Sequence, residues 1–317
     1  MAVLDVHDLR VTIERDHHAV AAVDGVSFQL ERGRVLGLVG ESGCGKSLTA
    51  LALLQLLPPV ARLSGSIRLQ ERELIGLPDA ALRSIRGAEI AMIFQEPMTA
   101  LNPVMTVGAQ VAEAVAAHQD VTARAAWDRA VALLTEVGIA EPARRARDYA
   151  HQLSGGMRQR VMIAMAIACT PAVLVADEPT TALDVTIQAG ILDLLRRLRT
   201  ERGMAVLLIT HDLGVVAEQA DDVAIMYGGR IVEQAPAAEL FAYPRHPYTQ
   251  ALLRSMPTLG VATERLTAIP GNVPGLGHLP SGCAFRDRCS QPTDRCAGDI
   301  PTLRPVGAHH YAACLYA

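Results

Sequence analysis

The chain has 317 residues, of which 50% are hydrophobic, 20% charged and 3% aromatic, and its formal net charge at pH 7 is −4. That length allows one large domain or two smaller ones with real cores. The charge balance excludes a global attraction to nucleic acid or to an anionic membrane, and the shortage of aromatics argues against a base-stacking surface. The N-terminus shows no signal-peptide pattern, and the longest apolar run, residues 161–169, is too short to cross a bilayer. We therefore expect a soluble, cytoplasmic chain.

Short apolar runs that do not alternate with polar residues predict strands buried on both faces, as in a parallel sheet. They cover residues 35–39, 90–94, 172–176, 205–209 and 223–226. Helical patterns separate these runs. One helix is expected over residues 47–57 and another over 185–202, where Gly203 is a helix stop. The pattern predicts an α/β fold of βαβ units around a mainly parallel sheet.

Residues 99–152 interrupt this alternation and are expected to form a helical subdomain inserted into the α/β domain. A short apolar helix is predicted over 107–117. Thr122 is expected to cap a second helix that ends at Gly138. Trp127, Val131, Leu134 and Val137 should lie near one face of that second helix.

From about Pro236 proline and glycine become frequent, which indicates a linker followed by a small tail that carries cysteines. We predict a first domain over residues 1–235 and a C-terminal extension over residues 236–317.

Residues 40–47 (GESGCGKS) match the phosphate-loop pattern G-x-x-x-x-G-K-[ST] between an apolar strand and a helix, the context that the pattern requires. The glycines allow backbone N–H groups to face phosphates, and the helix N-terminus adds partial positive charge. Lys46 is expected to bridge the β and γ phosphates, and Ser47 to ligate Mg²⁺. The expected ATP-binding residues are Gly40, Glu41, Ser42, Gly43, Cys44, Gly45, Lys46, Ser47 and Leu48.

Two acids, Asp177 and Glu178, end the apolar run that begins at Val173. Open α/β sheets place their ligands at such strand ends. Adjacent strand residues point to opposite sides, so we expect different roles. Asp177 should hold Mg²⁺, and Glu178 should orient and deprotonate the attacking water. His211 follows the next apolar run and is expected to stabilise the transferring phosphoryl group.

Residues 153–160 (LSGGMRQR) look like the signature motif of ABC ATPases, LSGGQxQR, with Met157 in place of the usual glutamine. Gln95 resembles the family's Q-loop glutamine, Asp184 in the stretch 182–184 resembles its D-loop aspartate, and His211 stands at the H-loop position. The motifs follow one another in the family's order. The resemblance covers residues 1 to about 235 and implies an ATP-hydrolysing P-loop cassette.

The resemblance implies that two cassettes close head to tail on two ATP molecules. Ser154, Gly155 and Gly156 would then bind the ATP held by the partner's phosphate loop. Asp184 would also lie at this shared site, and Gln95 would join Ser47 and Asp177 around Mg²⁺. The family usually stacks an aromatic residue on adenine, and here only His17 or His18 is available.

Three further stretches resemble the ATP-binding subunits of dipeptide and oligopeptide importers, namely residues 94–103 (FQEPMTALNP), 246–253 (HPYTQALL) and 282–296 (GCAFRDRCSQPTDRC). The resemblance implies a peripheral subunit on the cytoplasmic face of the inner membrane. Its partners would be two permease subunits, a second, non-identical ATP-binding subunit and an extracytoplasmic peptide-binding protein. Alternatives are an importer of nickel or glutathione, an exporter motor, or a soluble ABC ATPase. No coiled-coil insertion or second phosphate loop supports the soluble alternative, and no nucleic-acid partner is expected.

The tail contains Cys283, Cys289, Cys296 and Cys314, and this spacing lacks the C-x₂-C pairs of ordinary zinc sites. Four thiolates can also hold a [4Fe–4S] cluster, which the resemblance associates with this cysteine set. Zinc and unligated structural cysteines remain alternatives. The nearby His309 and His310 are expected to be ordinary surface residues.

Overall fold

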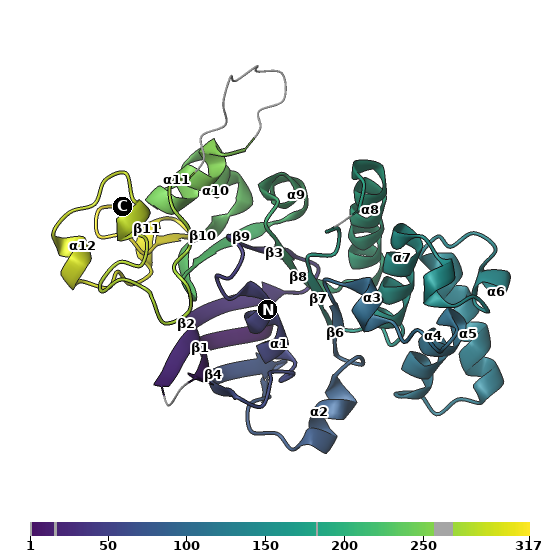
Figure 1. Ribbon diagram of the computed structural model, residues 1–317. Coiled ribbons are helices and arrows are strands. Elements are labelled where there is room, and N and C mark those ends of the chain that lie inside the picture. The colour runs from purple at the N-terminus through teal and green to yellow at the C-terminus, as the bar shows by residue number, and fades with distance from the viewer. Residues whose placement is uncertain (1, 16–17, 182, 257–268) are drawn as a thin grey trace. The chain divides into compact units, whose positions relative to one another are not determined.

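The computed structural model describes residues 2–15, 18–181, 183–256 and 269–317 (Figure 1). The chain divides into two compact units, and each is described by itself. Unit 1 comprises Met1–Val3, Leu30–Arg34 and Gly76–Leu207. Unit 2 comprises Leu4–Gln29, Val35–Ile75 and Leu208–Ala317.

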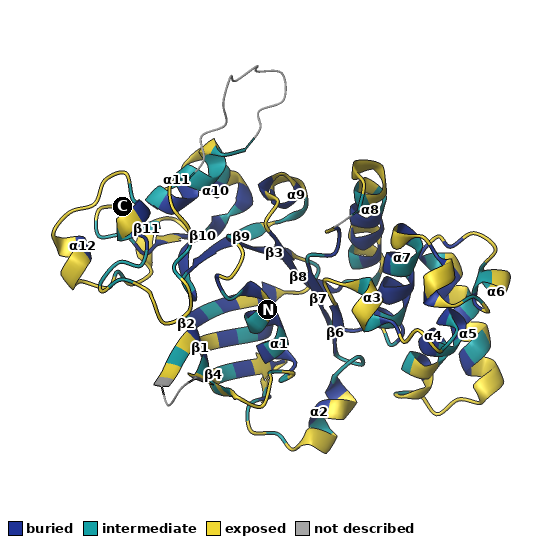
Figure 2. Ribbon diagram, viewed as in Figure 1, coloured by how far each residue is buried: buried dark blue, intermediate teal, exposed yellow. Residues whose placement is uncertain are grey.

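Unit 1 contains the parallel strands β6 and β7 and most of the helices that were expected around the signature motif. Its elements are α2 (Asp79–Ile85), β6 (Ile90–Ile93), α3 (Pro97–Ala100), α4 (Val107–Ala116), α5 (Ala123–Glu136), α6 (Pro142–Arg145), η1 (Ala150–Gln152), α7 (Gly155–Ala166), β7 (Val173–Asp177) and α8 (Val185–Arg202). Strands β6 and β7 pair in parallel, with Ile90 opposite Val173 and Ile93 opposite Ala176. Every residue of both strands is buried, as their uninterrupted apolar sequences predicted (Figure 2).

The helices of unit 1 begin and end where the capping signals predicted. The Thr122 side chain accepts a hydrogen bond from the Ala125 N–H and caps α5. Helix α8 ends at Gly203, which is left-handed (φ 63°). The predicted inner face of α5 was only partly right. Its buried helical residues are Ala126, Ala130, Leu133 and Leu134, whereas Trp127 and Val131 are only half-buried.

Unit 2 is built mainly from strands. Its elements are β1 (Ala2–Arg15), β2 (His18–Glu31), β3 (Val35–Val39), α1 (Lys46–Leu53), β4 (Ala61–Leu69), β5 (Arg72–Glu73), α9 (Leu213–Gln219), β9 (Asp222–Tyr227), β10 (Arg230–Pro236), α10 (Ala237–Ala242), α11 (Pro247–Arg254), η2 (Arg286–Arg288), α12 (Arg295–Gly298), β11 (Arg304–Gly307) and β12 (His310–Ala312). The first residues of β1 and the last of β2 are assigned to unit 1, and β8 (Ala205–Thr210) divides between the units after Leu207.

One antiparallel sheet has the strand order β2-β1-β4-β5. Its first two strands precede the phosphate loop in the sequence and its last two follow the loop. This sheet was not predicted. Buried and exposed residues alternate along much of it (Figure 2). A second set of strands contains β3 and β9 in parallel, with Leu38 opposite Ala224. Antiparallel pairing then continues from β9 to β10, β12 and β11. The predicted α/β fold with parallel strands is confirmed.

Two sequence expectations for unit 2 were wrong. Helix α1 ends at Leu53 rather than near residue 57, because Gln55 adopts a left-handed backbone conformation (φ 50°) ahead of Pro58. The linker expected directly after Pro236 is instead occupied by α10 and α11. Both helices are folded because they contribute to a shared core, in which Leu240 and Tyr248 are buried with Tyr227 and Phe285.

Candidate nucleotide-binding site

The phosphate loop connects β3 to α1 in unit 2, and its glycines are required sterically. Gly43 and Gly45 have positive φ angles of 81° and 107°, which favour glycine. A Cβ atom at Gly45 would lie 2.8 Å from the Ala22 carbonyl oxygen, and one at Gly40 would lie 2.2 Å from the Met226 carbonyl oxygen. The backbone therefore follows a path that side chains at Gly40 and Gly45 would block.

The lysine of the loop lies over the loop's own backbone. Lys46 Nζ donates hydrogen bonds of 2.7 Å to the Gly40 carbonyl oxygen and 2.9 Å to the Glu41 carbonyl oxygen. Ser47 is exposed at the first turn of α1. Cys44 is buried, and this burial raises the pKa of its thiol. In this loop the Lys46 ammonium thus lies close to the backbone, the Ser47 hydroxyl is open to solvent, and the Cys44 thiol is unreactive.

Glu41, the second residue of the loop, is bound on two sides by the C-terminal part of unit 2. Its carboxylate accepts hydrogen bonds of 2.7 and 2.9 Å from the two terminal nitrogens of Arg288. Its backbone N–H donates a hydrogen bond of 3.0 Å to Tyr248 Oη. Tyr248 belongs to the stretch 246–253 that resembled peptide importers, but no spacing in the sequence connected Tyr248 or Arg288 with the loop.

The predicted acidic pair ends β7 in unit 1. Asp177 is buried, whereas the Glu178 backbone turns into a left-handed conformation (φ 46°). Glu178 Oε2 accepts a hydrogen bond of 3.1 Å from Gln95 Nε2 and one of 2.7 Å from Thr181 Oγ1. The structure therefore brings the predicted Glu178 and Gln95 together and adds Thr181, which the sequence analysis missed.

The signature motif opens α7 as predicted. Ser154 is the N-cap of α7, and its hydroxyl accepts a hydrogen bond from the Met157 N–H. Asp184 likewise caps α8 by accepting a hydrogen bond of 2.9 Å from the Ile187 N–H. A Cβ at Gly156 would lie 2.6 Å from Ile187 Cγ2, so a side chain there would have to displace Ile187. The N-termini of α7 and α8 are thus held by contacts within unit 1.

The predicted residues divide between the two units. The phosphate loop and the exposed His211 belong to unit 2, whereas Gln95, Asp177 and Ser154 belong to unit 1. His17 and Ala182 lie outside the described residues, and the side chain of His18 is likewise not described.

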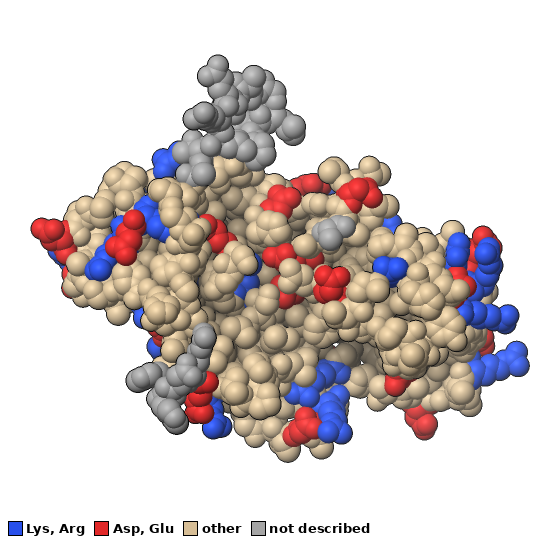
Figure 3. All heavy atoms as spheres, viewed as in Figure 1, with Lys and Arg blue, Asp and Glu red and all other residues tan. Residues whose placement is uncertain are grey.

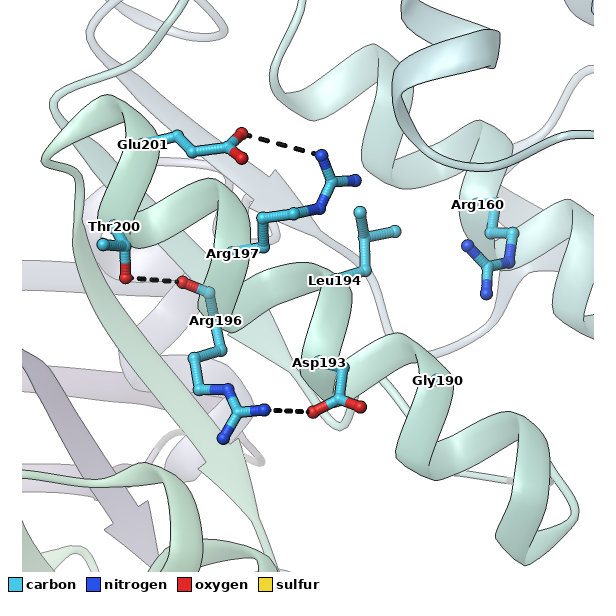
Figure 4. Close-up of a pocket in the computed structure, with 8 residues that line it drawn as sticks. All are labelled: Arg160, Gly190, Asp193, Leu194, Arg196, Arg197, Thr200 and Glu201. Carbon is cyan, nitrogen blue, oxygen red and sulfur yellow. Dashed lines mark hydrogen bonds and ion pairs between the residues drawn. The ribbon is translucent and has the colours of Figure 1, made fainter.

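A separate hollow of about 690 Å³ lies on unit 1 between residues of α7 and α8 (Figure 4). Arg196 pairs there with Asp193 at 2.6 Å, and Arg197 pairs with Glu201 at 3.6 Å. Burial and the charge of Arg197 lower the pKa of Arg160. The charged side chains of α8 described above are paired with neighbours on the same helix. This hollow therefore offers no evidence of an anion-binding site.

The four tail cysteines line one pocket of about 150 Å³ in unit 2. Burial raises the pKa of Cys283, and the proximity of Cys296, Cys289 and Cys314 raises it further. Over the described ranges, no three His, Cys, Asp or Glu side chains are grouped tightly enough to hold a single metal ion. A cluster of four irons binds each thiolate at a different iron, so its ligands stand farther apart than those of a single ion. Among the described residues the four thiols thus share one pocket without forming a compact ligand set.

A buried polar network next to these cysteines was missed. The prediction that His310 is a surface residue was wrong, because its side chain is 1% exposed and its Nε2 lies 2.7 Å from Glu233 Oε1. Glu233, on β10, is itself fully buried and accepts backbone hydrogen bonds from Arg245 and His246. His309 is exposed, as expected.

The parallel strands, the phosphate loop and the capped signature helix together define a P-loop nucleotide-binding cassette. Residues 23–181 match the family model described as ABC transporter, and residues 232–296 match the model described as oligopeptide/dipeptide transporter, C-terminal region. A putative peptide import ATP-binding protein of Brucella melitensis is 50% identical over 326 residues, which cover 99% of this chain and 96% of that protein. The dipeptide transport ATP-binding protein DppD of Haemophilus influenzae is 49% identical, over 97% of this chain and 94% of that protein.

Among solved structures, a dimer of the ATP-binding cassette MJ0796 bound to ADP and phosphate is similar with a TM-score of 0.66 and 27% identity, covering 74% of this chain and 98% of that one. The chain therefore belongs to the ABC transporter family, in the branch that carries the oligopeptide/dipeptide transporter C-terminal region.

Within the described residues, no helix combines the length and apolarity needed to cross a bilayer. Acidic and basic side chains are interspersed on the face shown in Figure 3.

Proposed function

We propose that the chain is the ATP-hydrolysing subunit that powers import of dipeptides or oligopeptides through an ABC transporter. The observation that carries this proposal is the combination, in one chain, of a complete phosphate loop at residues 40–47 with the oligopeptide/dipeptide transporter C-terminal region at residues 232–296. Relatives that are named for peptide import and match nearly the full length of the chain support it.

The proposed reaction is attack of water on the γ-phosphorus of ATP. The new P–O bond forms as the bond to the β–γ bridging oxygen breaks, which yields ADP and phosphate. Glu178 takes the proton from the attacking water, and the Gln95 amide holds the Glu178 carboxylate in position through the hydrogen bond described above. Lys46 and His211 stabilise charge on the phosphoryl group. Ser47, Asp177 and Gln95 would hold Mg²⁺, which neutralises phosphate charge when bound.

The signature motif supports an active site shared between two subunits. Ser154 caps α7, and the next two residues are glycines, so the helix start presents backbone N–H groups without side chains in the way. We propose that Ser154, Gly155, Gly156 and Asp184 complete the ATP site of a second, non-identical ATP-binding subunit. The residues from 99 to 152 would transmit closure to two permease subunits, and an extracytoplasmic peptide-binding protein would deliver the cargo.

The cassette would occupy residues 1–235 and the C-terminal extension residues 236–317, at the cytoplasmic face of the inner membrane. We further propose that Cys283, Cys289, Cys296 and Cys314 hold a [4Fe–4S] cluster. Support comes from their common pocket. Such a cluster would cross-link parts of the chain that have little other regular structure.

The test is uptake of a labelled dipeptide by proteoliposomes that contain the purified complex with its permeases and binding protein. Uptake should require ATP and should be lost in the Lys46→Ala complex, which lacks the loop cation. An Arg295→Ala complex is the matched control, because Arg295 is an exposed cation that pairs with Asp299. Robust ATP hydrolysis without peptide-stimulated turnover or uptake would contradict the peptide cargo and leave the ATPase assignment in place.

A further inference from the structure

The phosphate loop contains an acid beside the place where a polyanion is to bind. Glu41 directly follows Gly40, and Lys46 Nζ binds the backbone carbonyl oxygens of these two residues rather than the Glu41 carboxylate. A carboxylate without a counter-ion in this loop would repel the phosphates of a nucleotide. The loop therefore needs a second cation for Glu41.

Arg288 supplies that cation from the C-terminal region. Its two terminal nitrogens bind the two Glu41 oxygens at 2.7 and 2.9 Å. Its Nε donates a hydrogen bond of 2.9 Å to the Pro270 carbonyl oxygen. The Arg288 side chain is 6% exposed and that of Glu41 is 29% exposed, so the pair is sheltered on the arginine side. The planar fork fixes the direction of the carboxylate as well as neutralising it.

The surroundings of Arg288 make it rigid. It ends the short helix η2 between Cys283 and Cys289, and its guanidinium carbon lies 5.8 Å from the centre of the Tyr227 ring. Tyr248, which is buried against Tyr227, accepts the Glu41 N–H. One side of the loop is thus held by two groups that come from beyond residue 240.

We infer that Arg288 is a positioning residue for ATP binding, which holds and neutralises Glu41 so that the phosphate loop accepts a nucleotide. The inference rests on the proposed function, because it assumes that the loop binds ATP. It assigns the C-terminal region a direct part in forming the nucleotide site of its own chain. The segment from Cys283 to Cys289 contributes to the cysteine pocket and, through Arg288, to the contact with Glu41. Any change that orders this segment should therefore also order that contact.

The test measures the Kd of Mg·ATP for the full-length chain by calorimetry, and kcat and KM for the complete complex. R288A should raise Kd and KM by about tenfold or more, as expected for a sheltered carboxylate that loses its partner, with kcat at saturating ATP nearly unchanged. R288K keeps the charge but loses the fork, and should fall between R288A and the wild type. R295A, which removes an exposed tail cation, should bind like the wild type.

The double variant E41Q/R288A separates electrostatic positioning from general packing. It should recover most of the affinity that R288A loses, because no unpaired carboxylate remains. R288A with wild-type Kd, or a double variant that binds no better than R288A, would overturn the inference. Should R288A not fold, R288K and E41Q/R288K provide the same comparison. A wild-type chain that binds no Mg·ATP would instead contradict the proposed function.

Discussion

Gln95 and Glu178 are joined by a hydrogen bond of 3.1 Å although they are 83 positions apart in the sequence. The contact follows from topology, since each residue lies just beyond one of two parallel neighbours, β6 and β7. Parallel strands present their carboxyl ends at the same edge of a sheet. An amide and a carboxylate from distant parts of the chain therefore meet there, with Thr181 as a second donor to the same oxygen.

Replacing Glu178 by Gln should lower kcat of the transporter complex by roughly 10²-fold or more, because the amide cannot accept the proton of water. Mg·ATP binding should stay within a few-fold of the wild type, since the loop that holds the phosphates is untouched. Parallel turnover and equilibrium binding assays check both statements. Thr181→Val is the matched control, because it removes a hydrogen bond to Glu178 but keeps the carboxylate, and should cost far less. Hydrolysis at the wild-type rate by E178Q would rule out the general-base role.

Gly45→Ala should be much more harmful than Gly43→Ala. Both glycines have positive φ, which costs a residue with a Cβ about 1–2 kcal/mol. At Gly45 the added Cβ would also lie 2.8 Å from the Ala22 carbonyl oxygen, whereas at Gly43 nothing lies within 4 Å. We expect a larger loss of unfolding free energy in urea, and a larger loss of nucleotide affinity, for Gly45→Ala. Equal losses in the two variants would show that the close approach is unimportant.

Acidification should destabilise the protein through His246. Burial lowers the pKa of this side chain to about 4, below its ordinary value of 6.5. The folded state therefore disfavours protonation, so the contribution of His246 is fully present above pH 6.5 and is lost as the pH falls from 6.5 towards 4. The loss should reach about 2 kcal/mol at pH 5. Urea unfolding at pH 7 and pH 5 measures it, with His246→Asn as a non-titrating control. An equal loss of unfolding free energy on acidification in the wild type and in His246→Asn would contradict this prediction.

Glu233→Ala should cost about 3–5 kcal/mol of unfolding free energy, since it removes the carboxylate that binds His310 and two backbone N–H groups in a fully buried site. Glu239→Ala provides the comparison. Glu239 lies 3.6 Å from the same imidazole but is 39% exposed, and its loss should cost less than about 1 kcal/mol. Thermal and urea unfolding of both variants would reveal the difference, and similar small losses would refute the structural role of Glu233.

Anaerobic purification should yield a brown protein with about four irons and four sulfides per chain. Cys289→Ser should lose most of the iron, whereas Cys169→Ser should keep it, because Cys169 lies in unit 1 and is not among the residues that line the cysteine pocket. Iron and sulfide assays together with the visible absorption spectrum provide the readout. A colourless, iron-free and fully folded wild-type protein would count against the cluster.

The elements that could be predicted are those whose signal is local. The runs that became β3, β6 and β7 are uninterrupted apolar segments, and Thr122 and Gly203 are local helix signals, so all were predictable. The sheet of β1, β2 and β4 was missed because its strands mix charged and apolar residues over a long stretch. The burial of His310 depends on Glu233, 77 positions away, and no periodicity carries that information.

The same limit applies to the site. The phosphate-loop residues and the acids at the end of β7 could be predicted because strict backbone and charge requirements act within a few residues. The partners of Glu41 could not, because Tyr248 and Arg288 reach the loop only through the packing of the C-terminal region.

The distance along the chain between Glu41 and Arg288 has a consequence for biosynthesis. The two residues are 247 positions apart, so the loop leaves the ribosome long before its counter-ion is made. Until then a growing chain exposes a loop with an unpaired carboxylate and without the Tyr248 acceptor. Capture of ATP would thus become efficient only after translation has passed Arg288. Nucleotide binding would then report that the C-terminal region has been made and folded.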